Sequence, residues 1–532
     1  MANEAPVSDI SPKAVQALHC EEIIEDEHHP GSQVPIPIWM ALTSNTKVLV
    51  LSFFANLGAL MYGFDNMAVS LCMSMPAFQE QFGELTATGY VIPAYWQSLW
   101  NALPQLACMF GAWSIGHVSD WYGRRLSFFS AGVISMAGVA VLYISTTPAI
   151  FLVGKLINAF AMGMALATGQ SYVSEISPVR LRGILLSAYA FSMNVGLLIS
   201  ASIAFARIDV MNATAYNVVF AIGWVFPSLL ILFTWIVPES PHQLVRAGQH
   251  EKARRSLERI RNKEANVTAL LDEIVRTHRH EEELSSASGS KDHSFRECFR
   301  GENWRRTRII LFCNGLSQMT GATFLSNGPY FLTSAGVSAT NVGMMVEIGL
   351  AFAIASSIIN WCVIGSVGRR KIILTGIGIA MLFFLIMGIA SCFNTSAALW
   401  TIGIALQLTW WTMGLTTGPA MAIAGEVSQA RLRAESQSIG IAFNYFYSCV
   451  WNVVVPYMFN TDEGNLGGKM GWIFLATSSI SFAVVYFCFP ETKDRTYEEI
   501  GELFERRIPA RHFADYLHIG ASDESAYKLG KK

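Results

Sequence analysis

The segment SEISPVRLRG at residues 174–183 returns in altered form as GEVSQARLRA at residues 425–434, an offset of 251 residues. Two other segments return in the same order and at similar offsets, so the chain is predicted to hold two copies of one structural unit. These segments are GHVSDWYGRR at 116–125, which returns as GSVGRR at 365–370, and PESP at 238–241, which returns as PETK at 490–493.

The composition indicates that both copies lie in a membrane. Of the 532 residues, 52% are hydrophobic and 14% are charged, whereas about 25% are charged in an ordinary soluble domain. Twelve apolar runs are long enough to cross a bilayer, which takes about 20 residues. We therefore expect an all-α membrane protein with twelve transmembrane helices in two six-helix pseudo-symmetric halves. The runs lie near 48–72, 92–116, 126–146, 149–173, 184–206, 217–237, 307–334, 341–365, 371–392, 397–424, 435–459 and 471–489.

The lysines and arginines of the short loops lie almost all on one side of this topology, which the positive-inside rule assigns to the cytoplasm. Both termini and the long central segment, which has the composition of one or two short amphipathic helices, are then cytoplasmic. The expected divisions are a disordered segment at 1–47, a first half at 48–238, a cytoplasmic loop at 239–306, a second half at 307–489 and a tail at 490–532. We expect a protein that functions as a monomer.

The repeated segments also place acids and arginines at the cytoplasmic ends of the helices. Matched charges in the two halves favour a gate whose ion pairs hold the inner faces together when the cavity opens outward. Exposed ion pairs contribute only about 0–1 kcal/mol each, so charges that merely set the topology are the alternative. The predicted gate residues are Asp120, Arg124, Arg125, Glu175, Arg182, Glu239, Arg369, Arg370, Glu426, Arg433 and Glu491.

Further motifs accompany the repeats: GFD at 63–65, QMTG at 318–321, GPA at 418–420 and PETKDRTYEEIGELFERRIPARHF at 490–513. Together they resemble the sugar porter family of the major facilitator superfamily. The last segment and GPYFLTSAG, from residue 328, resemble the fungal branch, which includes α-glucoside (maltose-type) permeases. The resemblance implies the major facilitator fold, alternating access with a substrate site between the halves, and proton symport in many fungal members.

The resemblance assigns proton coupling to Asp65 of the GFD motif. The family's partner is an arginine in a Gly-Arg pair of the fourth helix, where this chain has Gly154 and Lys155. Asp65 lies about 25 Å along the first helix at 1.5 Å per residue, a depth similar to that of Lys155. Because charges inside a membrane are usually paired and functional, we expect a proton switch facing the central cavity. A static ion pair joining two helices is the alternative.

The substrate positions depart from the family. Hexose-binding members carry two fifth-helix glutamines where this chain has Ala190 and Leu197, and a tenth-helix aromatic residue where it has Ala422. A site without these amides recognises a simple hexose poorly, because each hydroxyl group needs a partner. A disaccharide, a glycoside or a more apolar molecule therefore fits better. The expected substrate-binding residues are Gln318, Asn444 and Tyr445, followed by Thr323, Asn327, Gln97 and Asn194.

Several functions are compatible with these residues. The preferred one is a proton-coupled carrier of a sugar or an α-glucoside in the plasma membrane. The same fold moving or exporting a polyol, an organic acid or a secondary metabolite is the alternative, and a nutrient sensor is the least favoured. The sequence has no nucleotide-binding loop, nucleophile elbow or metal-ligand cluster, so we expect no enzyme, cofactor or metal. Asn212 and Asn394 are candidate glycosylation sites. Glu347, a second embedded acid, is interpreted as an interface residue or an additional proton site.

Overall fold

A computed structural model describes residues 45–515, apart from 87–88, 209, 262–266, 288–295, 394, 429–431, 461–462, 494 and 496. From Lys47 onward the chain forms one compact unit. The predicted N-terminal segment at 1–47 lies almost wholly outside the described residues, and so does the end of the C-terminal tail.

The first half is helical over the predicted runs. The first run is divided at Asn56, whose side-chain amide donates to the carbonyl of Ser52 at 2.9 Å, and the sixth run is divided at Gly223 and Trp224. Its helices are α3 (Thr46–Ala55), α4 (Leu57–Cys72), α6 (Ala94–Tyr122), α7 (Arg124–Tyr143), α8 (Pro148–Ile176), α9 (Val179–Phe205), α10 (Thr214–Ile222) and α11 (Val225–Thr234).

The second half has the same order of helices, and its first predicted run is broken into three pieces. Gly321 ends the first piece with a φ of +93°, a left-handed conformation that residues with a Cβ rarely adopt. Interrupted helices of this kind are common near the substrate sites of transporters. The helices are α16 (Gly301–Met319), α17 (Ala322–Ser326), α18 (Gly328–Ser334), α19 (Ala339–Val367), α20 (Arg369–Ala390), α21 (Ser396–Val427), α22 (Arg433–Phe459) and α23 (Met470–Cys488).

Within the described residues, nine helices are long and apolar enough to cross a membrane. They occupy nine of the twelve predicted runs. The other three runs are helical as well and correspond to α6, to α16 through α18, and to α21. The all-helical membrane architecture is thus confirmed, and the count of twelve spans stays a prediction.

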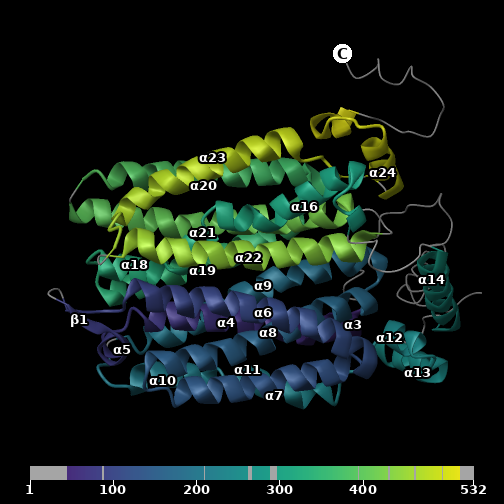
Figure 1. Ribbon diagram of the computed structural model, residues 1–532, viewed down its shortest axis with the longest axis horizontal. Coiled ribbons are helices and arrows are strands. Elements are labelled where there is room, and N and C mark those ends of the chain that lie inside the picture. Colours follow the sequence, from purple (N-terminus) through teal and green to yellow (C-terminus); the bar gives the residue numbers. More distant parts are fainter. Residues whose placement is uncertain are drawn as a thin grey trace, which may run out of the picture. The chain divides into compact units, whose positions relative to one another are not determined.

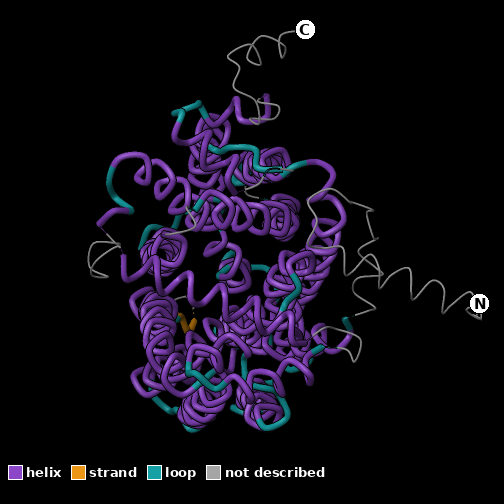
Figure 2. The backbone as a smooth tube through the Cα atoms, turned by 90° about the vertical axis from the view of Figure 1, so that its right-hand side faces the viewer, coloured by secondary structure: helices purple, strands orange, loops and turns teal. Residues whose placement is uncertain are grey.

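The helices of each half pack against one another, and two helix pairs make the main contacts between the halves. Figure 1 shows the first half in purple and blue below the second half in green and yellow, and Figure 2 shows most helices nearly end-on. Within the first half, α8 packs on both α6 and α7, and α4 packs on α9. Between the halves, α6 packs against α22 and α9 packs against α19. A substrate site between the halves would therefore be bordered by α4, α6, α9, α16, α19 and α22.

Small elements mark the two ends of the bundle. One end carries α5 (Pro76–Phe82) and a hairpin of antiparallel strands β1 (Glu84–Thr86) and β2 (Gly89–Val91). We call it the outer end, because the loop charges predict that it faces away from the cytoplasm. The other, inner end carries α12 (Pro241–Arg246), α13 (His250–Ile260) and α14 (Val267–Ala287) from the predicted loop, which share a small apolar core.

The beginning of the predicted tail is folded rather than extended. After η3 (Gly467–Lys469) and α23, the chain forms α24 (Tyr497–Glu505) and the short helix η4 (Ala510–Asp515). Their apolar side chains join the core of the second half at its inner end, where Arg305 and Arg306 of α16 lie over the ring of Phe504 at 5.1 and 4.7 Å. This cation-π contact anchors the tail to the start of the seventh predicted span.

Candidate functional site

A buried ion pair joins α4 to α8 inside the first half. The ammonium group of Lys155 contacts Oδ2 of Asp65, and the side-chain amide of Asn158 donates to Oδ1 of Asp65 at 2.9 Å. The exposed fractions of the residues are 8% for Asp65, 4% for Lys155 and 4% for Asn158. The expected similar depth of Asp65 and Lys155 is thus confirmed, whereas the contribution of Asn158 was not predicted.

Asp65 faces the interior of the first half rather than the space between the halves, so its predicted place in the central cavity is wrong. The carboxylate borders a small cavity lined by residues of α4, α7, α8, α10 and α11. The neighbours of α4 explain the difference, because Asp65 is bound by side chains of α8. Tyr62 turns toward α6 and donates to Oε1 of Gln105 at 3.1 Å.

An aromatic cluster lies where the first half meets α22. Tyr62 of α4, Tyr189 of α9 and Tyr445 of α22 pack around Cys108 of α6. The thiol of Cys108 donates to the hydroxyl oxygen of Tyr445 at 3.3 Å. Of these residues only Tyr445 was predicted. The sequence signal for Tyr62 is its position three residues before Asp65, on the helix that carries the proton motif.

The other substrate candidates that were ranked first lie near the break between α16 and α17. Gln318 accepts a hydrogen bond from the hydroxyl of Thr323 at 2.6 Å, across the left-handed Gly321. Asn444 of α22 donates to the backbone carbonyl of Asn314 at 2.5 Å. Gln318, Thr323 and Asn444 thus lie on the neighbouring helices α16, α17 and α22, and their contact with a substrate remains a prediction.

The remaining candidates bond across the two halves. Gln97 donates to Oδ1 of Asn460 at 3.2 Å, and Asn327 accepts from Asn101 at 3.2 Å. Asn194 of α9 donates to the hydroxyl of Ser357 of α19 at 3.2 Å. Amide side chains often join helices in membranes, so these contacts favour a role in holding the halves together.

Two serine hydroxyls add to the contacts at the outer end. Ser70 of α4 donates to the carbonyl of Ser326 at 2.5 Å, and Ser98 of α6 donates to the carbonyl of Val453 at 3.2 Å. Together with the pairs of Gln97 and Asn101, they tie the first half to α17, α18 and α22.

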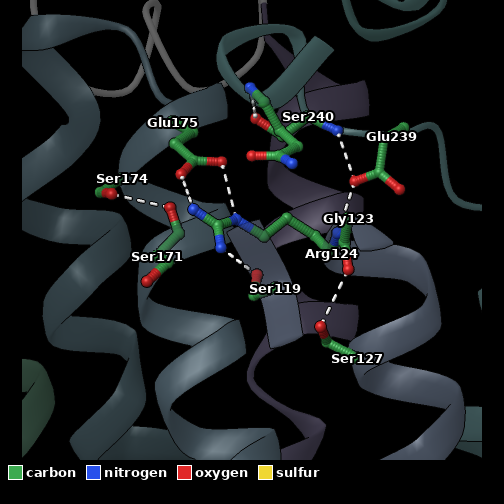
Figure 3. Close-up of polar contacts among 10 residues, drawn as sticks. Ser119, Gly123, Arg124, Ser127, Ser171, Ser174, Glu175, Glu239 and Ser240 are labelled. Atoms are coloured by element: carbon green, nitrogen blue, oxygen red, sulfur yellow. Dashed lines mark hydrogen bonds and ion pairs between the residues drawn. The ribbon is translucent and has the colours of Figure 1, made fainter. Parts of the chain in front are cut away.

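At the inner end, the charged residues of the first half form one connected network (Figure 3). The guanidinium group of Arg124 donates to both carboxylate oxygens of Glu175, at 2.7 and 3.3 Å, and also to Ser119. Glu239 accepts from the backbone N–H groups of Arg124 and Arg125 at 2.7 and 3.2 Å. A carboxylate at this place satisfies free N–H groups at the start of α7 and complements the helix dipole.

The second half repeats this arrangement. Arg369 pairs with Glu426 at 3.2 Å, and Glu491 accepts from the backbone N–H groups of Arg369 and Arg370 at 3.0 and 3.2 Å. Burial raises the pKa of the Glu426 carboxyl, while neighbouring Arg369 acts in the opposite direction. Glu426 lies two residues beyond the predicted span 397–424. Because its pKa is raised, acidification should neutralise Glu426 and release Arg369 at a higher pH than it would for an exposed glutamate.

The repeated geometry extends to the second arginine of each motif. Arg125 donates to the carbonyls of Thr234 and Trp235 at the end of α11, and Arg370 donates to the carbonyl of Tyr486 at the end of α23. These contacts, like the ion pairs of Arg124 and Arg369, lie within one half. The side chains of Asp120, Arg182 and Arg433 lie outside the described residues, so the predicted latch between the halves stays a prediction.

The two candidate glycosylation sites differ in what the structure describes. Asn212 is exposed just before α10 at the outer end, and its backbone carbonyl accepts from Ala215. Asn394 lies outside the described residues.

This arrangement of two matched helical halves, with an embedded ion pair in the first, is that of a secondary transporter of the major facilitator type. Residues 51–504 match the model of the family described as sugar (and other) transporter. The chain belongs to this family, which confirms the resemblance predicted from the motifs. Because the family consists of membrane transporters, the prediction that the chain is not an enzyme is confirmed too.

Individual relatives agree with this assignment. The chain is 30% identical over 486 residues to the MFS transporter fmqE of Aspergillus fumigatus, covering 89% of this chain and 90% of that protein. It is 28% identical over 522 residues to the general alpha-glucoside permease of Saccharomyces cerevisiae, covering 96% and 84%.

Among solved structures, the proton:xylose symporter XylE bound to 6-bromo-6-deoxy-D-glucose superposes with a TM-score of 0.68 at 19% identity, over 87% of this chain and 100% of that one. The inward open conformation of XylE from E. coli gives a TM-score of 0.67 at 20% identity, over 86% and 99%. At such identities the likeness establishes the fold, which is the major facilitator fold.

Proposed function

We propose that this protein is a proton-coupled carrier that moves a sugar or glycoside of the α-glucoside type across the plasma membrane by alternating access. The observation that carries the proposal is the buried pair of Asp65 and Lys155. A carboxylate and an ammonium group inside a membrane protein are costly unless they are paired and used. The name of a relative, general alpha-glucoside permease, supports the substrate class.

The pair supplies a mechanism for coupling. Lys155 stabilises the charged carboxylate of Asp65 while the two groups are in contact. When α4 and α8 shift relative to each other, the carboxylate is separated from the ammonium group that balances its charge. Proton binding would thereby be linked to the conformational step that exposes the substrate site to the other side.

The hydrogen bonds at the outer end support a state in which that end is closed. Ser70, Ser98, Gln97 and Asn101 all reach from the first half to the second there. In the outward-facing state these bonds would have to break. The charged residues at the inner end, with Asp120, Arg182 and Arg433 among them, would form the opposing gate in that state.

The topology and the processing of the chain form part of the same proposal. Both termini and the segment 239–306 face the cytoplasm. The two six-helix halves at 48–238 and 307–489 carry the transport pathway. Asn212 is then on the extracellular side and open to glycosylation. A single chain suffices for function, because both halves of the substrate site lie in one polypeptide.

A non-sugar small molecule is the second candidate. It is favoured by the aromatic cluster of Tyr62, Tyr189 and Tyr445, whose rings offer apolar surface. A substrate with an apolar or aromatic part would match this surface better than a simple hexose would.

The decisive experiment compares uptake of radiolabelled maltose at acidic and neutral pH in yeast cells that lack their own maltose permeases. The wild-type protein should accumulate maltose more strongly at acidic pH, and Asp65→Asn should lose this difference. The matched control is Glu80→Gln, an acid-to-amide change at an exposed residue of α5, which should keep the pH dependence. Retention of wild-type, pH-dependent uptake by Asp65→Asn would refute the coupling role. Failure of the wild-type protein to take up labelled mono- or disaccharides would favour the non-sugar candidate.

A further inference from the structure

Asp65 is linked by Asn158 to a third helix. Asn158 lies one turn after Lys155 on α8, and its amide oxygen accepts from the hydroxyl of Ser135 on α7 at 2.7 Å. Its amide nitrogen donates to Asp65 at 2.9 Å. Ser135 is 1% exposed. The three side chains therefore form a buried chain of hydrogen bonds that runs from α7 through α8 to α4.

Asn158 completes the binding of the carboxylate. A lysine is a compact point charge and does not present the rigid two-donor fork of an arginine. Lys155 contacts Oδ2 of Asp65, and Asn158 supplies the bond to Oδ1. Both oxygens of the buried carboxylate are thereby satisfied, as buried polar groups require.

Asn158 and Ser135 can also bond to the neutral acid. A carboxylate only accepts hydrogen bonds, a carboxylic acid also donates one, and amide and hydroxyl groups do both. After one proton binds to Oδ1 of Asp65, a half-turn of the Asn158 amide brings its oxygen to the acid, which donates to it. The amide nitrogen then donates to the Ser135 oxygen, and the serine proton turns to a carbonyl one turn earlier in its helix.

The space around the pair allows this rearrangement. The cavity beside Asp65 is lined by Ser135 and Asn158 together with mainly apolar residues of α4, α7, α10 and α11. It has room for about one water molecule and polar groups to hold it. The cavity lies within the first half, so exchange of a proton with Asp65 need not pass through the aromatic cluster.

Few other titratable groups face Asp65. Lys155 comes from α8, Cys108 from α6, and Tyr62 from the same helix as Asp65. Cys72, also of α4, lies near Lys155 and near Tyr216 of α10. From α7 and α11, the residues that line the cavity carry no titratable side chain. Within the described residues, Lys155 is thus the cation that balances the charge of Asp65.

We propose that Asn158 and Ser135 are positioning residues that keep Asp65 hydrogen-bonded in both its charged and its neutral form. The proton then enters and leaves without leaving an unpaired polar group in the protein interior. This inference rests on the proposed function, in which Asp65 is the proton site.

Infrared difference spectroscopy of the purified full-length protein during a pH titration tests the inference and needs no substrate. The C=O stretching band of the neutral Asp65 acid is identified by its loss in Asp65→Asn. In Asn158→Leu this band should shift to higher frequency, because the acid loses the group to which it donates. Ser135→Ala should shift the band less, and Ser135→Thr, which keeps the hydroxyl, should restore the wild-type position.

Two matched variants serve as controls. Asn56→Leu removes a buried asparagine that bonds to Ser52 and does not contact Asp65, and Ser130→Ala removes a hydroxyl of α7 that bonds to Ser127. Both should leave the band unchanged. An unshifted band in Asn158→Leu, or an equal shift in the controls, would overturn the role of Asn158 and leave the proposed coupling through Asp65 untouched. If Asp65→Asn removes no band, then Asp65 does not titrate, and the proposed coupling itself fails.

Discussion

Removing two serine hydroxyls at the outer end should change the equilibrium between the state closed at that end and the outward-facing state. Ser70 and Ser98 each donate to a backbone carbonyl of the opposite half, at 2.5 and 3.2 Å. A hydrogen bond of this kind contributes about 1 kcal/mol net. The variant Ser70→Ala with Ser98→Ala should therefore favour the outward-facing state by about 2 kcal/mol, a change of about 30-fold in the equilibrium constant.

The change can be measured as a distance between the halves. Two spin labels are attached through ketone-bearing amino acids at Met211 and Phe393, which are exposed in outer loops of the first and second half. Electron paramagnetic resonance should show a larger population at the long distance in the double variant. Each single variant should change the equilibrium constant about 5-fold, since about 1 kcal/mol corresponds to that factor.

A matched control separates the contact between halves from the loss of a hydroxyl. Ser114 also lies on α6, but its hydroxyl donates to the carbonyl of Gly111 in the same helix at 2.9 Å. Ser114→Ala should leave the distance distribution unchanged. An unchanged distribution in the double variant would refute the reasoning, because it would show that these hydroxyls do not stabilise closure.

Two further predictions concern stability at the inner end. In Gly368→Ala the new Cβ would lie 2.7 Å from Oε2 of Glu491 at a φ of +97°. The loss of stability should exceed the roughly 1–3 kcal/mol that a strained backbone conformation costs by itself, and thermal unfolding in detergent should show a lower Tm. Gly378→Ala, in the helix that follows Gly368, has open space around its Cβ and should not lower the Tm, so equal Tm values for the two variants would contradict this explanation. Phe504→Ala removes a buried ring from the tail, which costs about 3–5 kcal/mol, and limited proteolysis should then cleave near α24. Phe487→Ala, at an exposed ring, is the control, and equal resistance of the two variants would show that Phe504 does not hold the tail.

The sequence was sufficient to predict a helical membrane protein with two matched halves, because apolar runs and repeated motifs can be read from the sequence alone. The pairing of Asp65 with Lys155 followed from the family resemblance, and helix direction and rise per residue placed the two residues at a similar depth. The sequence was not sufficient for the side of α4 on which Asp65 lies. That rotation depends on which neighbours pack against the helix, and therefore Asp65 faces α8 and the interior of its half instead of the central cavity.

Asn158 and the tail show two different ways in which sequence reasoning fell short. Asn158 follows Lys155 by three residues, a spacing that places both on one face of a helix, so its signal was present and not used. The tail residues Ile500, Leu503 and Phe504 also have helical spacing, but their docking on α16 requires knowledge of the surface they meet. Gln97, Asn194 and Asn327 have the composition of a binding site, and only coordinates show that their amides bond across the halves.

The glycine of each Gly-Arg-Arg motif is coupled through its contacts to an acid far along the chain. Gly123 leaves room for the carboxylate of Glu239, and Gly368 leaves the same room for Glu491, more than a hundred residues away in each case. Replacing the glycine displaces the acid, and replacing the acid leaves helix N–H groups unsatisfied, so the start of each helix depends on both residues. Each pair therefore couples two positions that are separated by most of the sequence of one half. The same coupling recurs in both halves, as expected for two copies of one structural unit.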